Sequence, residues 1–465
     1  MAEYTFGSVE DSDVLFGRSA AAGRFGFFPA TALSGNTYAC RRWNLETSSP
    51  VGEVYGNVDY IRQLPSLLGL GCYLVDDAHN RKKLDPANHY RFASGGTAQL
   101  DGSAGQYMWG TRVPFYIAIW TEGHYLYKAA SLKPIPGRAC WRIPIFSKSA
   151  FNAGVMDRTE NKLCSIINTA ERYRGGNNTV LTGTAHADNL SQLGYPATEI
   201  GTSTFELRGE ARGAGWGAGW YWIETVTEIL FEIIMGTQHC QTAYNANKDA
   251  NGLYQGGLGP GVSAMPSWAD YNGNHPVIPT SAGVSLADGV GVSNFAVLNS
   301  AGATVYTAPV PVFFGLKNPY GSLYVGKNLI VAKKLSDGSY AFYVARTSRG
   351  VWDYTATNDM LYVGDLAAPA EAGWDYIKRL NYNGLAGMPA EGGGTASTYY
   401  ADGMYRDVAT SGFRAPWGSG SARDGDYAGL AYFRGHSAPA NAYAYLSSPL
   451  CETPDDFDPS PVVYS

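Results

Sequence analysis

The sequence predicts an α+β fold with short strands, long ordered loops and one well-defined helix. Its 465 residues include 57 glycines and 33 tyrosines, and only 16% of them are charged. This composition favours strands and turns over helical bundles. The strongest helical period of apolar residues lies at 221–236. The chain is too long for one small core, so we expect two or three domains.

Along the chain, the first 50 residues are rich in aromatic and turn-forming residues, which predicts a small β-rich or irregular region. A short helix is expected just before Gly69. Residues 112–120 and 124–129 are expected to pair as a hairpin through Glu122-Gly123. Loops are expected at 81–106 and 367–404. Later strand-like runs occur at 295–298, 311–316, 323–330 and 340–346.

The predicted helix at 221–236 ends at Gly236, a typical C-terminal stop. Glu224, Glu228 and Glu232 share another face at i, i+4 spacing, where like charges repel slightly. We expect these carboxylates to form a solvated or arginine-paired face and not a metal site. The apolar stripe comprises Ile223, Val226, Ile229, Leu230, Ile233 and Ile234.

Charge and cysteine usage exclude several classes. The net charge is −6 without a run of like charges, which argues against a basic stripe that binds nucleic acid. Neither a secretory signal nor an apolar run of membrane-spanning length is found, so no membrane insertion is expected. The six cysteines are scattered without a CxxC pair, which predicts reduced, mostly buried thiols and no zinc site.

The segment 418–451 has an unusual composition. Gly and Ala alternate there with Ser, Arg, Asp, Tyr, His and Asn, without a hydrophobic period. Lys, Glu, Gln, Met and Trp are absent, and these are the types that an Asn codon ending in a pyrimidine cannot reach by changes at its adenines. Tyr, Ser, Gly and Asn are the residues that binding loops favour. The segment therefore predicts a binding surface, with an ordinary surface loop near the C-terminus as the alternative.

Several blocks within 106–451 resemble the variable proteins of diversity-generating retroelements, and most closely those of phages of gut Bacteroidales. The blocks are RVPFY (112–116), TFELRGEARGAGW (204–216), GLKNPYGSLY (315–324), GMPAEGGGTASTYYADGMY (387–405), GFRAPWGSGS (412–421) and DGDYAGLAYF (424–433). The resemblance implies a C-type-lectin fold of the subgroup shared with formylglycine-generating enzymes. It also implies a tail-fibre or tail-tip protein of the virion that binds a host cell-surface protein or glycan.

A diversified protein must keep its fold whatever its variable side chains are, so variable positions should face solvent while constant ones carry the packing. Gly425, Ala428, Gly429, Leu430 and Leu446 fit the constant role. The positions expected to form the ligand-binding surface are Ser419, Ser421, Arg423, Asp424, Asp426, Tyr427, Tyr432, Phe433, Arg434, His436, Ser437, Asn441, Tyr443 and Tyr445.

The same resemblance suggests a division of the chain. Residues 1–105 match less well and are expected to attach the protein to other tail proteins or to its own copies, as a trimer. Residues 106–455 are expected to form the ligand-binding domain, with the variable region at about 412–451 and a tail at 456–465.

Three other classes of protein are alternatives to a binding protein of this kind: an enzyme, a calcium-dependent lectin and a structural protein. A formylglycine-generating enzyme needs a paired thiol or metal site near the domain end, and Cys451 has no such neighbour. A triad from Asp426, His436 and Ser437 would need adjacent residues to converge, and no GxSxG motif is present. A calcium-dependent lectin needs Glu-Pro-Asn or Gln-Pro-Asp, which do not occur. A structural surface protein remains the third alternative. We therefore expect neither an enzyme nor a cofactor.

Overall fold

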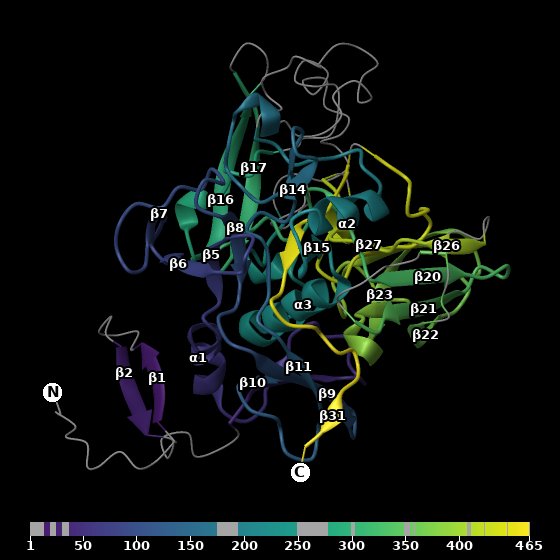
Figure 1. Cartoon of the computed structure of the whole chain (residues 1–465). Coiled ribbons are helices and arrows are strands. Elements are labelled where there is room, and N and C mark those ends of the chain that lie inside the picture. The colour runs from purple at the N-terminus through teal and green to yellow at the C-terminus, as the bar shows by residue number, and fades with distance from the viewer. Residues whose placement is uncertain are drawn as a thin grey trace.

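Antiparallel β-sheet dominates the structure, a computed structural model of the 465-residue chain (Figure 1). The residues it describes are 14–18, 25–29, 37–173, 194–248, 278–298, 303–347, 354–355, 357, 359–406, 411–422, 424–443 and 445–464. These residues form seven sheets and three α-helices, α1 (Val58–Leu68), α2 (Thr202–Glu210) and α3 (Tyr221–Met235).

The expectation of an α+β C-type-lectin fold is therefore wrong, because the fold is β-rich. Segments expected to be loops, such as 81–106 and 367–404, contain strands instead. Their partners are often distant in sequence: β25 pairs with β28, for example. Strand formation depends on such neighbours more than on local propensity, so the local sequence pattern underestimates the sheet content.

Two large sheets involve the first 150 residues. The six-stranded sheet has the order β31 (Val462–Val463), β11 (Ala139–Ile143), β9 (Phe115–Glu122), β10 (Tyr125–Ser131), β3 (Ala39–Asn44) and β4 (Glu53–Val54). A seven-stranded sheet has the order β15 (Trp216–Ala218), β30 (Leu450–Glu452), β12 (Ser147–Ser149), β8 (Gln106–Gly110), β5 (Gly71–Val75), β6 (Arg81–Asp85) and β7 (Asn88–Phe92).

A second seven-stranded sheet lies in the C-terminal half and contains the parallel pairs β25–β28 and β19–β29. Its order is β24 (Met388–Gly392), β23 (Gly373–Asn381), β25 (Gly403–Arg406), β28 (Phe433–Arg434), β27 (Trp417–Gly418), β19 (Tyr324–Gly326) and β29 (Leu446–Ser447). A four-stranded sheet has the order β22 (Met360–Leu366), β21 (Tyr340–Ala345), β20 (Ile330–Lys334) and β26 (Gly412–Arg414).

Three smaller sheets complete the described strands. They are the pairs β1 (Val14–Arg18) with β2 (Phe25–Pro29) and β13 (Val155–Asp157) with β14 (Lys162–Cys164), and the three strands β16 (Val290–Leu298), β17 (Thr304–Phe313) and β18 (Leu316–Lys317). No described helix is long and apolar enough to cross a membrane.

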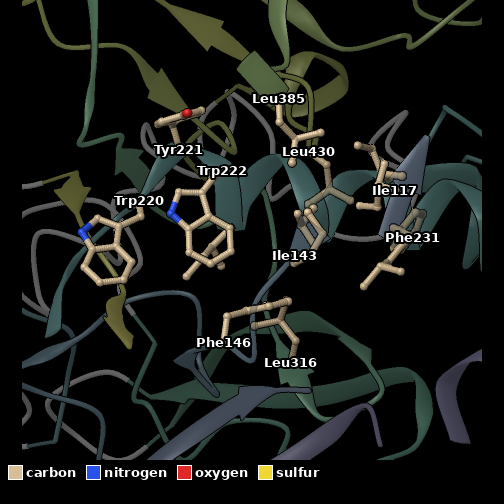
Figure 2. Close-up of a cluster of buried hydrophobic side chains, with 14 of the residues drawn as sticks. Ile117, Ile143, Phe146, Trp220, Tyr221, Trp222, Phe231, Leu316, Leu385 and Leu430 are labelled. Atoms are coloured by element: carbon tan, nitrogen blue, oxygen red, sulfur yellow. The ribbon is translucent and has the colours of Figure 1, made fainter. Parts of the chain in front are cut away.

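Helix α3 lies at the centre of the molecule (Figures 1 and 2). The prediction for 221–236 is confirmed: the helix spans Tyr221–Met235, and Gly236 follows in the left-handed conformation with φ 82°. Its residues from Tyr221 to Ile233 are all buried. Trp222 stacks on Phe457 at 4.7 Å between ring centroids, so the chain end also packs against this helix.

Other local predictions are confirmed as well. Helix α1 precedes Gly69, and the side chain of Asn57 caps its N-terminus. The hairpin β9–β10 turns at Gly123, which has φ 58°. In contrast, the run 323–330 is divided between β19 and the start of β20, because these strands belong to different sheets.

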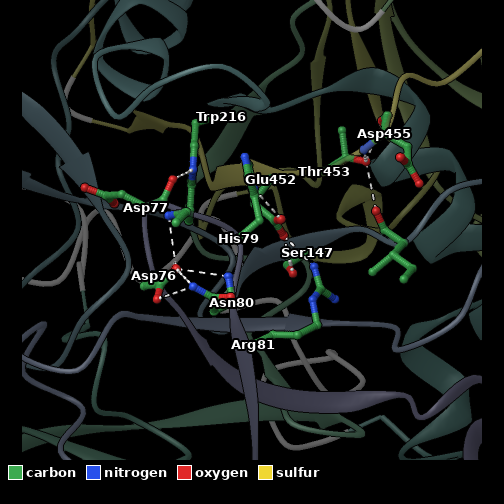
Figure 3. A network of polar contacts seen from close by, with 12 residues as sticks. Asp76, Asp77, His79, Asn80, Arg81, Ser147, Trp216, Glu452, Thr453 and Asp455 are labelled. Carbon is green, nitrogen blue, oxygen red and sulfur yellow. Dashed lines mark hydrogen bonds and ion pairs between the residues drawn. The ribbon is translucent and has the colours of Figure 1, made fainter.

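Residues on both sides of position 105 share sheets and core. Strand β5 pairs with β8, and β3 pairs with β10. The C-terminal strand β30 lies between β15 and β12. Its Glu452 is buried and accepts hydrogen bonds from Arg81 at 2.7 Å and Ser147 at 2.9 Å, and its other oxygen lies 2.8 Å from His79 (Figure 3). Side chains from the N-terminal third of the chain thus contact one carboxylate from its C-terminal part.

We predict that a chain beginning at Ala104 does not fold cooperatively. It lacks α1, whose Leu64 and Leu68 belong to the same core cluster as α3. It also lacks β5, one of the two strands that pair with β8, and β3, one of the two strands that pair with β10. Thermal melting followed by circular dichroism checks this, with a chain beginning at Thr37 as the control, since β1 and β2 pair only with each other among the described strands. A sharp transition for the shorter chain would contradict the prediction.

Candidate ligand-binding surface

The three glutamates of α3 are buried, so the expectation of a solvated or arginine-paired face is wrong. Glu224, Glu228 and Glu232 are 6%, 2% and 1% exposed. Lysines pair with them: Lys148 of β12 donates to both carboxylate oxygens of Glu224, at 2.8 and 2.7 Å. The like charges at i, i+4 spacing are tolerated because ammonium groups lie beside them.

The hydrogen bonds around these glutamates form a network that also joins the N-terminal and C-terminal halves of the chain. Lys128 of β10 donates to Glu232 and to the hydroxyl of Tyr382, and that hydroxyl donates to Glu228 at 2.7 Å. Burial raises the pKa of Glu232 to about 8, although Lys128 opposes this shift. Burial lowers the pKa of Lys327, which lies near these glutamates. The network holds the core together, and each of the three glutamates has a hydrogen-bonding partner in it.

A second buried group brings Cys72, His89 and Asp288 together, with one ligand atom of each lying within 4.8 Å of the others. Asp288 Oδ1 lies 2.9 Å from His89 Nε2, and Oδ2 accepts a hydrogen bond from Lys83 at 2.7 Å. The remaining imidazole nitrogen contacts the hydroxyl of Tyr107. Burial raises the pKa of Cys72 to about 12, so the thiol stays protonated. All these groups have protein partners, and we assign them a structural role.

One face of the sheet formed by β23, β25, β28 and β27 carries large side chains in a line. Trp374 lies opposite Tyr405, Tyr405 opposite Arg434, and Arg434 opposite Trp417. Directly paired residues point to the same face of a sheet. Because neighbouring strands are about 4.8 Å apart, these four side chains form a row about 14 Å long. We call them the cross-strand row.

The opposite face of the same strands belongs to the core. Met404 and Phe433, which precede Tyr405 and Arg434, are 0% and 1% exposed. The ring of Phe433 packs edge-on against Phe342 of β21 at 5.6 Å. Alternation along each strand therefore directs one residue inward and the next toward the outer face.

At one end of the row, Tyr427 stacks on two aromatic rings. Its centroid lies 4.6 Å from those of Trp374 and Tyr376, with interplanar angles of 22° and 26°. The space for Tyr427 comes from Gly403, where a Cβ atom would lie 2.5 Å from the tyrosine ring. Trp374 retains 39% exposure. This end of the row therefore presents aromatic surface to solvent.

Arg434 occupies the middle of the row. Its guanidinium carbon lies 5.2 Å from the ring centroid of Tyr324 and 5.6 Å from those of Tyr405 and Trp417, within cation–π range. It donates to the hydroxyl of Tyr324 at 2.9 Å and contacts His436 at 3.1 and 3.2 Å. Among the described residues, no carboxylate forms an ion pair with it. Arg434 is therefore a half-buried cation among aromatic rings.

The other end of the row is covered by two tyrosines. Tyr443 and Tyr445 stack with centroids 5.1 Å apart at an angle of 11°. Tyr443 meets Trp417 edge-on at 5.5 Å, and its hydroxyl accepts a hydrogen bond from Asn441 at 3.1 Å. These residues thus cover the end of the cross-strand row at which Trp417 is buried.

The structure divides the predicted surface residues into two groups, and Arg423 lies outside the described residues. The half-buried group, at or near the outer face, comprises Asp426, Tyr427, Arg434, His436, Asn441, Tyr443 and Tyr445. The buried group comprises Ser419, Ser421, Asp424, Tyr432, Phe433 and Ser437. For this second group the expectation of solvent exposure is wrong.

The reason, for Ser421, Asp424 and Tyr432, is that these polar side chains form hydrogen bonds inside the protein. Asp424 accepts hydrogen bonds from Tyr324 at 3.0 Å and from the hydroxyl of Ser421 at 2.9 Å. Tyr432 is 0% exposed and stacks on Tyr324 at 5.6 Å. Buried polar groups are stable when they are hydrogen-bonded, so a polar composition does not by itself indicate a surface.

Besides the buried Trp417, three residues of the outer face were not among the predicted ones: Trp374, Tyr376 and Tyr405. They come from β23 and β25, in or next to the region expected to be loop. The alternation of aromatic and polar residues in GWDYIKRLN is typical of a strand and is the signal that would have located the first two.

Comparisons with known proteins add no family to this description. No protein-family model matches the sequence, and a search of curated proteins finds no match either.

We predict that Gly403→Ala displaces Tyr427 and lowers stability by about 1–3 kcal/mol, as overpacking does. The new methyl group would overlap the tyrosine ring and its Cβ atom. Denaturant unfolding measures the change. In a Tyr427→Gly background the same substitution should cost little, because the overlapping atoms are gone. An equal cost in both backgrounds would show that Tyr427 does not pack on Gly403.

Proposed function

We propose that this chain is a binding protein that recognises a host cell-surface ligand through the outer face of the cross-strand row. The observation that carries the proposal is the row itself: aromatic side chains surround an arginine that forms no ion pair with any carboxylate among the described residues. Trp, Tyr and Arg are the residues that dominate binding energy at protein surfaces.

The surroundings of the row favour a receptor-binding role. Its covering residues, Tyr427, His436 and Tyr443, all come from the Gly- and Ala-rich segment 418–451, whereas the strands below them are fixed by core packing. Binding sites are commonly built from loops on a rigid scaffold. This agrees with the resemblance to retroelement variable proteins, which present changing side chains on a constant frame.

We extend the proposal to the setting that this resemblance implies: a receptor-binding protein of a phage tail, assembled as a homo-oligomer with other tail proteins. Diversification would then fall on the half-buried positions around the row, where side chains can change without burying an unpaired charge.

The binding role is tested with the double variant Trp374→Ala, Tyr405→Ala. Binding of purified protein to a panel of bacterial strains should fall about thirtyfold or more, since hot-spot truncations cost about 2 kcal/mol or more each. Tyr362→Ala is the matched control, because Tyr362 is an aromatic residue 50% exposed on β22. Thermal melting verifies folding. Unchanged binding by the folded double variant would refute the proposed surface.

The diversification role predicts where natural variation occurs. Sequencing of the gene from independently grown phage populations should show changes at codons of half-buried residues such as Asp426, Tyr427, His436 and Tyr443. Codons for the buried Ser421, Asp424 and Tyr432 should stay constant, because most replacements there would break internal hydrogen bonds. Invariant sequence throughout 418–451, or variation centred on the buried positions, would contradict this role.

A further inference from the structure

We propose that Arg434 binds the carboxylate of an acidic sugar whose ring lies on the aromatic side chains of the cross-strand row. The inference rests on the proposed function, because it names the ligand class of the same surface.

The first support is the set of hydrogen-bond donors on Arg434. A guanidinium has five N–H groups. Nε and Nη2 contact His436, and Nη1 donates to Tyr324. A neutral imidazole accepts at only one of its two nitrogens, so these contacts leave at least one N–H on each terminal nitrogen without an acceptor among the described residues. Two neighbouring N–H groups form the fork that binds a carboxylate through two parallel hydrogen bonds.

The second support is the charge around Arg434. The nearest acid along the hydrogen-bond network is Asp424, which accepts from the hydroxyl of Tyr324 at 3.0 Å. That bond orients Tyr324 so that its oxygen accepts from Arg434. Asp424 therefore acts on Arg434 through a phenol and does not occupy its fork. A ligand carboxylate would supply the direct anion that the described protein residues lack.

The third support is the aromatic surface beside the fork. Tyr405 lies between Arg434 and Trp374, and Trp374 is 39% exposed. The flat face of an aromatic ring packs well against the C–H face of a sugar. Polar groups lie at the margin, among them the amide of Asn441 and the hydroxyl of Tyr443. Apolar faces combined with polar edges suit a sugar ring.

The sheet itself disfavours an acidic peptide as the ligand. Extended peptides commonly bind by adding a strand to a free sheet edge. Strands β25, β28 and β27 are interior and have a neighbour on each side. The main chain around Arg434 therefore offers no edge, and recognition has to come from side chains.

The test uses the full-length protein and immobilised oligosaccharides that contain glucuronic, galacturonic or N-acetylneuraminic acid. Each oligosaccharide is paired with its own methyl ester, which keeps the ring and removes the charge. Acidic peptides form a further arm. We expect binding to at least one acidic oligosaccharide and loss of that binding on esterification.

Two variants assign the effect to the fork. Arg434→Gln should lower affinity about thirtyfold or more, as loss of a buried charge partner does. Arg434→Lys keeps the charge without the fork and should also bind more weakly than the wild type. Arg379→Gln is the control, because Arg379 lies on β23 but pairs with Glu391 at 2.9 Å and is largely exposed.

The inference is overturned if the methyl esters bind equally well, if Arg434→Gln binds as the wild type does, or if only acidic peptides bind. If no oligosaccharide binds while binding to bacterial cells persists, the sugar assignment fails and the proposed function stands. Should Arg434→Gln fail to fold, the ester comparison on the wild type and the Arg434→Lys variant still decide the matter.

Discussion

The rest of the structure depends on the burial of α3 with three ionisable side chains on one of its faces. A helix without a solvent-facing side needs partners for its carboxylates, and here they come from strands β10 and β12 and from Tyr382. Removing one partner from a buried ion pair is strongly destabilising because the remaining charge is left uncompensated. The pairs Lys128–Glu232 and Lys148–Glu224 therefore fix the N-terminal sheets against the helix, and Tyr382 joins the C-terminal half to the same network.

Further hydrogen bonds link the network around the glutamates to the strands that carry the cross-strand row. Tyr382 and Tyr400 share a hydrogen bond in the network around the glutamates, and Asp402 lies two residues after Tyr400. Asp402 is buried and accepts a hydrogen bond from the backbone of Ala431 at 2.8 Å, within the segment that carries Arg434. The backbone that carries the side chains of the outer face is thus held by a hydrogen bond to a buried carboxylate. Such support lets surface residues change without loss of the fold, and it pre-organises those that bind.

Local signals in the sequence predict the local elements well. The apolar stripe of α3, the cap of α1 by Asn57 and the turn at Gly123 all depend on residues within a few positions of one another. The sheet content is underestimated because strands such as β28 have only two residues and exist through distant neighbours. The segment 418–451 includes Arg434, but its polar composition conceals that Asp424 and Tyr432 are buried. Trp374 enters the same surface from another part of the chain, which composition alone does not reveal.

The position of β30 has a consequence for the order of folding. This strand lies between β15 and β12, so Lys148 pairs with Cys451, which is far from it in the sequence, and Glu452 accepts a hydrogen bond from Arg81. During synthesis on the ribosome, β12 and β15 emerge long before the strand that belongs between them. Contacts of such long sequence separation slow folding and keep unpaired strand edges exposed. The nascent chain consequently cannot complete this sheet until β30 has been synthesised, so the pairing of Leu450–Glu452 with β12 and β15 is the step that closes the sheet.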